Sequence, residues 1–353
     1  MRANINKKII SHILIVKYRA LGDSLIGLGT IAYIKKLYPQ VHVTYAIPNW
    51  IVPLYTNLQS SADQIIPLSL ENLRGWWKTY LLLKRLNRLN RIDLIFEFHQ
   101  NGRSKYFFNL FSKLHYIRYL FHNHHQSIPA PAIQRDLQGI AALLPIPAPP
   151  NYLDYPPRVH IKNITNTNNS NGLLDKKTIK VILGISATRQ SKIWPINYFL
   201  ELAELLSANK QSAHKDQCWE FLIPLSNSDH DQFLEAEIKR NAINRICSLN
   251  FVKVGLAELP LIIADCDIYI GNDSGIKHLA VALNIPTFTF FGPEDPEEWH
   301  PYNSTQHQYF FVADLVCRTA KLHFCGKDKC EDHKCLKMIS VREVYDRICK
   351  YDN

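Results

Sequence analysis

The sequence lacks any long run of apolar residues. Its clearest apolar segments, residues 13–16 and 287–291, have only the length of a β-strand, whereas a helix that crosses a membrane needs roughly 20 apolar residues. The N-terminus is basic and then briefly apolar, without the long apolar region and the small-residue cleavage site of a secretory signal. These absences predict a cytosolic protein without a transmembrane helix.

The eight cysteines include no C-x2-C pair, the closely spaced motif that indicates a zinc site. In the cytosol they are expected to be reduced thiols. Four of them, Cys317, Cys325, Cys330 and Cys335, cluster near the C-terminus. The cluster leaves two alternatives open, thiols that pack within loops or ligands of a zinc or iron ion, and the wide spacing favours the first. We therefore expect neither a bound metal nor another cofactor.

Acidic residues are scarce relative to basic ones, 31 against 41, which gives a net charge of +10. Residues 71–120 hold ten Lys and Arg but only three Asp and Glu, a local excess of seven. Such a block is usually a solvated face, but it also suits phosphate groups, nucleic acid or an acidic membrane. Because no helix-turn-helix, zinc-finger or RNA-binding motif is present, we expect no nucleic-acid partner.

The 353 residues are 46% apolar and 20% charged, a composition typical of a globular protein long enough for two α/β domains. Strand and helix patterns alternate along the chain, as in parallel βαβ units. They predict an N-terminal domain over 1–162, an Asn- and Thr-rich linker over 163–178, and a second domain over 179–353. Two such domains imply a ligand-binding cleft between them. The predicted strands are 12–17, 41–46, 92–98, 179–184, 219–224, 268–271 and 287–291; the predicted helices are 23–37, 73–89, 196–208, 229–240, 256–265, 274–283 and 341–351.

The first predicted strand runs into a short polar segment that ends in Gly22 and Asp23. Gly22 permits a tight turn, and Asp23 falls at the start of the helix that follows. Asp23 has two interpretations: an N-cap that accepts hydrogen bonds from free backbone N–H groups, or a base at the carboxyl end of a strand, facing the cleft.

The second domain carries three further segments at the carboxyl ends of strands. Residues 184–195 combine Ser186 and Thr188 with Lys192, a set that suits a diphosphate although surface loops often contain it. Residues 271–278 read GNDSGIKH and open a helix, whose free N–H groups favour an anion. Residues 291–296 are expected only to shape the rim of the cleft.

In this order and spacing the segments resemble the ADP-heptose:lipopolysaccharide heptosyltransferases, glycosyltransferase family 9. The resemblance extends over nearly the whole chain, and the GNDSGIKHLAVAL block is its most specific part. The matching segments are ILIVKYRALGDSLIGLGTIAYIKKLYP, GISATRQSKIWPINYFLELAELL, ADCDIYIGNDSGIKHLAVALNIPTFTFFGPEDP and CGKDKCEDHKCLKMISVREV.

The resemblance implies a GT-B architecture, with two Rossmann-like domains facing each other across a cleft. It implies an inverting, metal-independent transfer of heptose from ADP-heptose to the lipopolysaccharide inner core. Asp23 matches the family's proposed general base, and Arg103 and Lys105 fall where the N-terminal domain meets its acceptor. Among the donor-binding positions, Thr188 and Lys192 match residues that contact the diphosphate, and Asp273 matches a residue placed for the sugar hydroxyls. The full set of matching donor-binding positions is Ser186, Thr188, Lys192, Asp273, Ser274, Gly275 and His278.

Some positions depart from the family pattern. Leu183 and Ala187 replace a proline and a second hydroxyl, and residues 226–230 lack a glutamate expected at the ribose, for which Asp229 is a weak substitute. A transferase for another nucleotide-sugar or a protein acceptor therefore stays open as an alternative. A non-catalytic relative is disfavoured because Asp23 is retained. Because the implied acceptor is a lipid and the chain is basic, we expect peripheral contact with the cytoplasmic face of the inner membrane.

Overall fold

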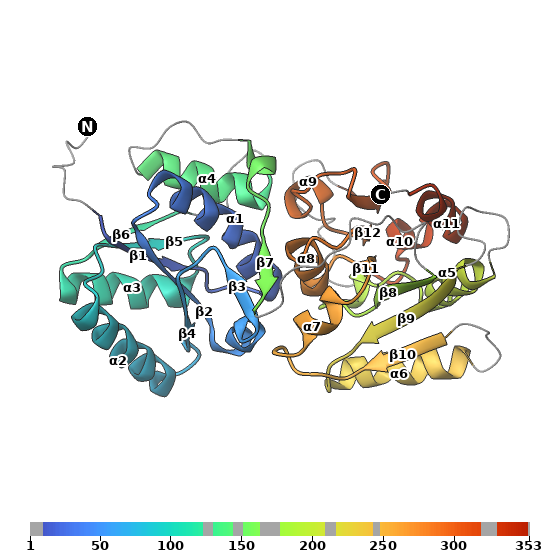
Figure 1. The fold of residues 1–353 in the computed structure, drawn as a ribbon, viewed down its shortest axis with the longest axis horizontal. Coiled ribbons are helices and arrows are strands. Elements are labelled where there is room, and N and C mark those ends of the chain that lie inside the picture. The colour runs from blue at the N-terminus through green and yellow to red at the C-terminus, as the bar shows by residue number, and fades with distance from the viewer. Residues whose placement is uncertain are drawn as a thin grey trace. The chain divides into compact units, whose positions relative to one another are not determined.

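The computed structural model describes residues 10–122, 130–143, 151–162, 177–208, 217–242, 248–318 and 330–351. Contacts divide the chain into two compact units (Figure 1). Unit 1 comprises residues 1–55 and 60–157, and unit 2 comprises residues 56–59 and 158–353. Most of the predicted linker, residues 163–176, lies outside the described residues.

Unit 1 is built on a five-stranded sheet in which every pair of neighbouring strands is parallel. The strand order is β4-β2-β1-β5-β6. All five residues of β1 are buried, as expected for a central parallel strand covered on both faces. The strands are β1 (His12–Val16), β2 (His42–Pro48), β4 (Gln64–Leu68), β5 (Leu94–Glu97) and β6 (Arg118–Phe121).

Helices cover both faces of this sheet. Right-handed crossovers put α1 (Leu21–Leu37) on one face, where it contacts α4 (Ala132–Leu143). They put α2 (Leu73–Leu89) and α3 (Gly102–His115) together on the other face. The 3-10 turns η1 (Asn49–Tyr55) and η2 (Tyr152–Asp154) complete unit 1. A small sheet pairs β3 (Leu58–Ser60) with β7 (Val159–Ile161), and all of its residues except Ser60 belong to unit 2.

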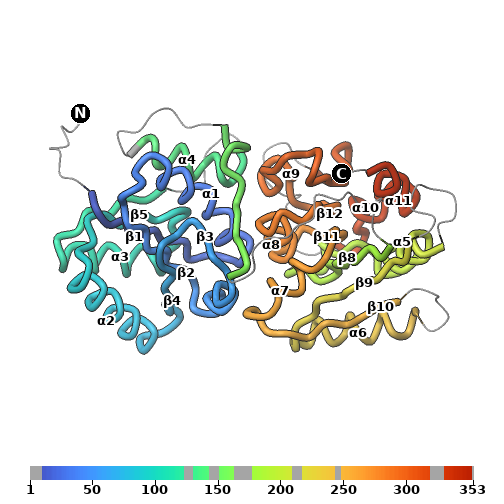
Figure 2. Tube along the Cα trace, viewed as in Figure 1, coloured from blue at the N-terminus to red at the C-terminus, as the bar shows by residue number. Residues whose placement is uncertain are grey.

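Unit 2 is built on a six-stranded parallel sheet in the order β10-β9-β8-β11-β12-β13. Its strands are β8 (Thr178–Gly184), β9 (Cys218–Pro224), β10 (Ser248–Val252), β11 (Ile268–Asn272), β12 (Thr287–Phe291) and β13 (His307–Phe311). Its helices are η4 (Gln190–Lys192), α5 (Ile196–Ser207), α6 (Asp229–Asn241), α7 (Leu259–Ala264), α8 (Gly275–Ala282), α9 (Pro296–Trp299), α10 (Lys334–Lys337) and α11 (Val341–Cys349). The course of both units along the chain is clearest in Figure 2.

A buried tryptophan anchors the core of unit 2. Trp194 stacks on Phe290 with ring centroids 4.2 Å apart, and its indole N–H donates to the Ile339 carbonyl at 3.1 Å. The C-terminal segment before α11 is thereby fixed to the same core as the sheet. Among the described residues, no helix combines the length and hydropathy that crossing a bilayer requires.

The predicted α/β class is confirmed, and two local predictions are wrong. Helix α1 begins at Leu21, so Gly22 is a buried helical residue rather than part of a tight turn. The N-cap is Ala20, and Asp23 lies inside the first turn. Helix α7 is shorter than predicted because residues 256–258 form a turn before Pro260.

Candidate functional site

The candidate base lies at the topological switch point of the first sheet. Strand order reverses between β1 and β5, so the segments that follow these two strands diverge at the carboxyl edge, where α/β sheets bind ligands. Asp23 follows β1 and is half-buried. The structure thus keeps Asp23 at the edge where a base is useful, and removes the N-cap interpretation of its role.

A buried ion pair in unit 1 contributes to the electrostatic environment of Asp23. Lys17 donates to Asp136 at 2.9 Å, and both side chains are fully buried. The other carboxylate oxygen of Asp136 lies 2.9 Å from Nε2 of His122. Burial raises the pKa of Asp23, while the positive charges of Lys17 and Arg19 oppose that rise. Neither Lys17 nor Asp136 was anticipated, because 119 residues separate them and no local motif joins them.

The acceptor candidates lie on the other side of the switch point. Arg103 and Lys105 are exposed in the first turn of α3, directly after β5. Asn101 fixes this turn, since its side-chain oxygen accepts from the Ser104 backbone at 3.1 Å and its amide donates to the Tyr18 carbonyl at 2.8 Å. The loops after β1 and β5 are therefore tied together, and the two cationic residues lie at the same sheet edge as Asp23.

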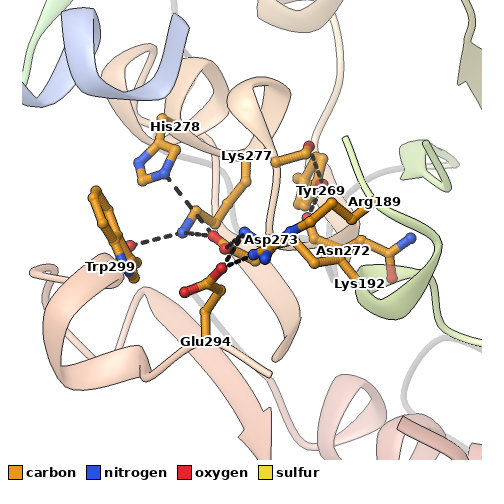
Figure 3. Close-up of polar contacts among 10 residues, drawn as sticks. Arg189, Lys192, Tyr269, Asn272, Asp273, Lys277, His278, Glu294 and Trp299 are labelled. Carbon is orange, nitrogen blue, oxygen red and sulfur yellow. Dashed lines mark hydrogen bonds and ion pairs between the residues drawn. The ribbon is translucent and has the colours of Figure 1, made fainter. Parts of the chain in front are cut away.

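The second sheet has its switch point between β8 and β11, and a dense ionic cluster lies there (Figure 3). Asp273 follows β11, and Lys192 from the segment after β8 donates to it at 2.8 Å. Lys277, one turn along α8, donates to the other carboxylate oxygen at 2.6 Å and to the Trp299 carbonyl at 2.8 Å. The structure thus brings two of the predicted donor residues, Lys192 and Asp273, into direct contact.

Charge neutralisation explains the ionisation of this cluster. Burial alone would raise the pKa of Asp273, but Lys192 and Lys277 together hold it well below its usual range. Burial lowers the pKa of Lys277 to about 8, and the Asp273 charge limits that fall. His278 is buried and contacts the Tyr302 hydroxyl through Nδ1. Burial and the nearby Lys277 lower the pKa of His278 well below its usual value, so this imidazole is neutral at pH 7.

Glu294 and Lys277 are members of the cluster that the sequence patterns did not reveal. The Glu294 carboxylate contacts Arg189 and lies 3.6 Å from Lys192, although its segment was expected only to form a turn. Lys277 could have been predicted from the sequence, because a lysine four residues after Asp273 is placed to form an ion pair with it at the start of a helix. Glu294 carried a weaker signal, an acidic residue after a strand adjacent to β11.

The other predicted donor residues have different surroundings. Ser186 donates to Asp231 at 2.6 Å, whereas Thr188 is exposed. Asp231 also accepts from the Ser226 backbone, so it, and not the exposed Asp229, organises the loop after β9. Ser274 is the N-cap of α8 without a side-chain capping bond, and Gly275 begins the helix.

These features together form an anion-binding arrangement. The first turn of α8 offers backbone N–H groups that its N-cap side chain does not bond, and a helix N-terminus favours negative charge. Lys192 is 14% exposed and is held beside this turn by Asp273. A phosphate at this position would meet both a cation and backbone donors. Within the described part of the chain, no group of three His, Cys, Asp or Glu side chains is arranged to hold a metal ion.

Comparison with known proteins gives a consistent assignment. Residues 104–319 match glycosyltransferase family 9 (heptosyltransferase). Lipooligosaccharide heptosyltransferase 2 of Haemophilus influenzae is 23% identical over 312 residues, which cover 82% of this chain and 86% of that protein.

Two solved structures share the fold over almost their whole length. A family 9 glycosyl transferase from Veillonella parvula superposes with a TM-score of 0.69 at 16% identity, covering 95% of each chain. An E. coli heptosyltransferase with ADP superposes with a TM-score of 0.62 at 16% identity, covering 96% of this chain and 98% of the other. The two parallel sheets therefore match the GT-B heptosyltransferases, as predicted. The chain belongs to glycosyltransferase family 9, the heptosyltransferase family, and is a glycosyltransferase.

Proposed function

We propose that the protein transfers a heptose from ADP-heptose to a hydroxyl of the lipopolysaccharide inner core, with inversion at the anomeric carbon and without a metal ion. The observation that carries the proposal is the Lys192–Asp273–Lys277 cluster beside the first turn of α8, at the switch point of a Rossmann-type sheet. The similarity to a lipooligosaccharide heptosyltransferase of H. influenzae supports it, as does the shared fold with an E. coli heptosyltransferase solved with ADP.

The donor diphosphate is assigned to the second unit. The ammonium group of Lys192 and the backbone N–H groups of α8 would bind the phosphates, and the exposed Thr188 hydroxyl would add a hydrogen bond. Both carboxylate oxygens of Asp273 are occupied by lysines, so we assign Asp273 to positioning Lys192 rather than to contacting the sugar. His278 is buried, with Nδ1 against the Tyr302 hydroxyl and Nε2 4.0 Å from the Asp273 carboxylate, so we assign it to positioning Asp273.

The reaction needs one proton acceptor and one stabilised leaving group. Asp23 would take the proton from the acceptor hydroxyl as that oxygen bonds to C1 of the heptose, while the bond from C1 to the diphosphate oxygen breaks and ADP leaves with the electron pair. Positive charge develops at the sugar and negative charge at the diphosphate, and Lys192 and the α8 turn would stabilise the latter. A raised pKa makes Asp23 a stronger base than an exposed aspartate.

Acceptor recognition is assigned to the first unit. Inner-core acceptors carry carboxylates and phosphates, for which the exposed Arg103 and Lys105 are suitable partners. These side chains and Asp23 follow adjacent parallel strands of one sheet. The acceptor's lipid would place the protein at the cytoplasmic face of the inner membrane.

A transfer assay with a choice of donors tests the proposal. ADP-heptose should support transfer to a heptose-deficient core oligosaccharide, and a uridine nucleotide-sugar should not. Lys192→Ala should weaken ADP binding by roughly 10- to 100-fold in calorimetry, because a charge-assisted hydrogen bond to phosphate is lost. The exposed Lys334→Ala, on α10, serves as the matched control with unchanged affinity. If none of the core acceptors receives heptose, the proposal is refuted.

A further inference from the structure

The outer face of α2 and α3 exposes large apolar side chains that the fold leaves unburied. On α2 these are Leu73, Trp77 and Leu81, four residues apart and therefore on one stripe. On α3 they are Tyr106, Leu110 and Leu114, at the same spacing. Trp77 is 61% exposed and Tyr106 is 70% exposed. Single exposed apolar residues need no explanation, but two parallel rows on neighbouring helices form a patch.

The two helices form one surface because their inner faces interlock. Trp76 of α2 meets Phe107 of α3 edge-on with ring centroids 5.4 Å apart, and Tyr80 meets Phe111 at 5.9 Å. Both helices cover the same face of the first sheet, as Figure 1 shows for unit 1. The exposed rows are therefore carried on a packed, rigid support.

Basic side chains are interleaved with these apolar rows, and neither helix contains a single acidic residue. Helix α2 exposes Arg74, Lys78, Lys84, Arg85 and Arg88, and α3 adds Lys113 to its two acceptor candidates. Within the part of the chain that the structure describes, no ion pair joins any of these side chains to an acid. The positive charge is therefore available to a partner.

We propose that this α2–α3 face is a docking surface for an anionic lipid bilayer. Tryptophan and tyrosine favour the zone between lipid headgroups and acyl chains, leucine enters it, and lysine and arginine attract anionic headgroups. A nucleic acid would use the charge but would gain little from two rows of leucine and aromatic residues.

The position of the surface suits the proposed function. The reason for the protein to bind a bilayer rests on that function, because the acceptor is a lipid. Helix α3 begins at the sheet edge that carries Asp23 and ends at the left-handed residue Tyr116, which is almost fully exposed. Arg103 and Lys105 lie in the first turn of the same helix, so a bilayer docked on α3 would come near the residues assigned to an acceptor that is itself anchored in lipid.

Vesicle co-sedimentation of the full chain tests the inference directly. Binding to phosphatidylcholine vesicles containing phosphatidylglycerol should exceed binding to pure phosphatidylcholine and should fall as salt is added. The K84E/R85E/R88E variant should lose at least roughly 100-fold in partitioning, because three basic groups near the surface each contribute about 1 kcal/mol and the new carboxylates repel the anionic headgroups. The W77S/L81S variant, which keeps every charge, should lose roughly tenfold. A control with the same charge change on exposed lysines of unit 2, K334E/K337E/K350E, should bind like the parent.

Three outcomes would overturn the inference. They are equal binding to neutral and anionic vesicles, loss of binding in the unit 2 control as large as in the α2 variant, and binding unaffected by W77S/L81S but competed away by duplex DNA. Transfer to a lipid-free core oligosaccharide separates this inference from the proposed function. Both α2 variants should keep that activity. If the parent protein shows no transfer to the lipid-free acceptor, the proposed function is refuted. If the parent transfers heptose but does not bind anionic vesicles, only the docking surface is refuted.

Discussion

A carboxylate that acts as a base must keep its proton affinity high without being locked into an ion pair. Asp23 meets this requirement because Lys17, one of the two cations that act on it, is already paired with Asp136 at 2.9 Å. Lys17 lowers the pKa of Asp23 only in part, and burial keeps the net shift upward. The Lys17–Asp136 pair therefore acts on the pKa of Asp23 through its charges, and not by forming an ion pair with it.

Replacing the base should stop chemistry and leave donor binding intact. Asp23→Asn keeps the size of the side chain but accepts no proton, so kcat should fall by about 10² to 10⁴. The melting temperature should not fall, because the half-buried carboxylate is replaced by a neutral group and no N-cap is lost. Steady-state kinetics, ADP calorimetry and a thermal melt on one preparation check all three points. Near-normal turnover would exclude Asp23 as the base.

The ion pair should set the pH dependence of the reaction. Asp23 must be deprotonated to act, so its raised pKa moves the acidic limb of kcat/KM to higher pH. Asp136→Asn removes a negative charge that raises this pKa and frees Lys17 to lower it further. The acidic limb should therefore move to lower pH in the variant. An unchanged limb would contradict the electrostatic role given to Asp136.

The same variant should also be less stable. A buried Lys17 without its anion costs about 3–5 kcal/mol in the free energy of unfolding, which chemical denaturation can measure. The pH profile is the readout that distinguishes an electrostatic role from mere support of the fold, because lost stability alone would not move it.

Residues near one another in sequence were the predictable ones. The block containing Asp273 and His278 was identified from a run of eight residues, and Lys277 was within reach of the i, i+4 rule. Asp136 was not, since its partner lies 119 residues away and no pattern in the sequence links the two positions. Glu294 was missed because the glycine and proline beside it indicated only a turn.

At the scale of elements, the donor site depends on the close approach of two strands. Gly271 of β11 lies opposite Gly184 of β8. A Cβ added at Gly271 would come within 2.6 Å of the Cα and the carbonyl oxygen of Gly184, and backbone atoms cannot move aside. The two glycines let the loops that carry Lys192 and Asp273 converge.

A methyl group at this point should therefore disturb the site as well as the sheet. Gly271→Ala should lower the free energy of unfolding by about 1–3 kcal/mol and weaken ADP binding, because Asp273 follows two residues later. Gly102→Ala is the matched control, since nothing lies within 4 Å of its added Cβ. Denaturant titration and calorimetry on both variants test this, and equal effects in the two would count against the steric explanation.

Sequence patterns predicted the long apolar strands and amphipathic helices and missed shorter pieces. Strands β1, β8 and β12 are apolar runs, which identify buried parallel strands. Strand β6 carries Arg118 and is partly exposed, and β10 mixes polar with apolar residues and has no buried position. Neither segment therefore showed the apolar run that indicates a strand. The predicted start of α1 was two residues late, because Gly22 indicated a turn, whereas in the structure it is buried within the helix.

At the scale of the whole molecule, both sheets use the same topology and both candidate sites lie at a switch point. In each unit the first strand is central, and the strand order reverses beside it. One unit offers a carboxylate, Asp23, and the other offers cations. This division matches a reaction that needs a base at one substrate and charge neutralisation at the other. It also predicts how the protein should respond to removal of metal ions.

Removal of divalent metal ions should leave the transfer rate unchanged. The diphosphate that departs needs positive charge, which a metal ion supplies in many transferases; in the proposed site Lys192 and the first turn of α8 would supply it instead. Excess chelator should therefore not lower kcat of the parent, and magnesium should not restore Lys192→Ala. Chelation should not lower the melting temperature either, because the wide cysteine spacing predicts thiols rather than metal ligands; Cys325 of that cluster lies outside the described residues. Elemental analysis of protein purified under reducing conditions should find well below one zinc or iron per chain. A rate lost with chelator and regained with magnesium would show that a metal ion, and not Lys192, neutralises the leaving group.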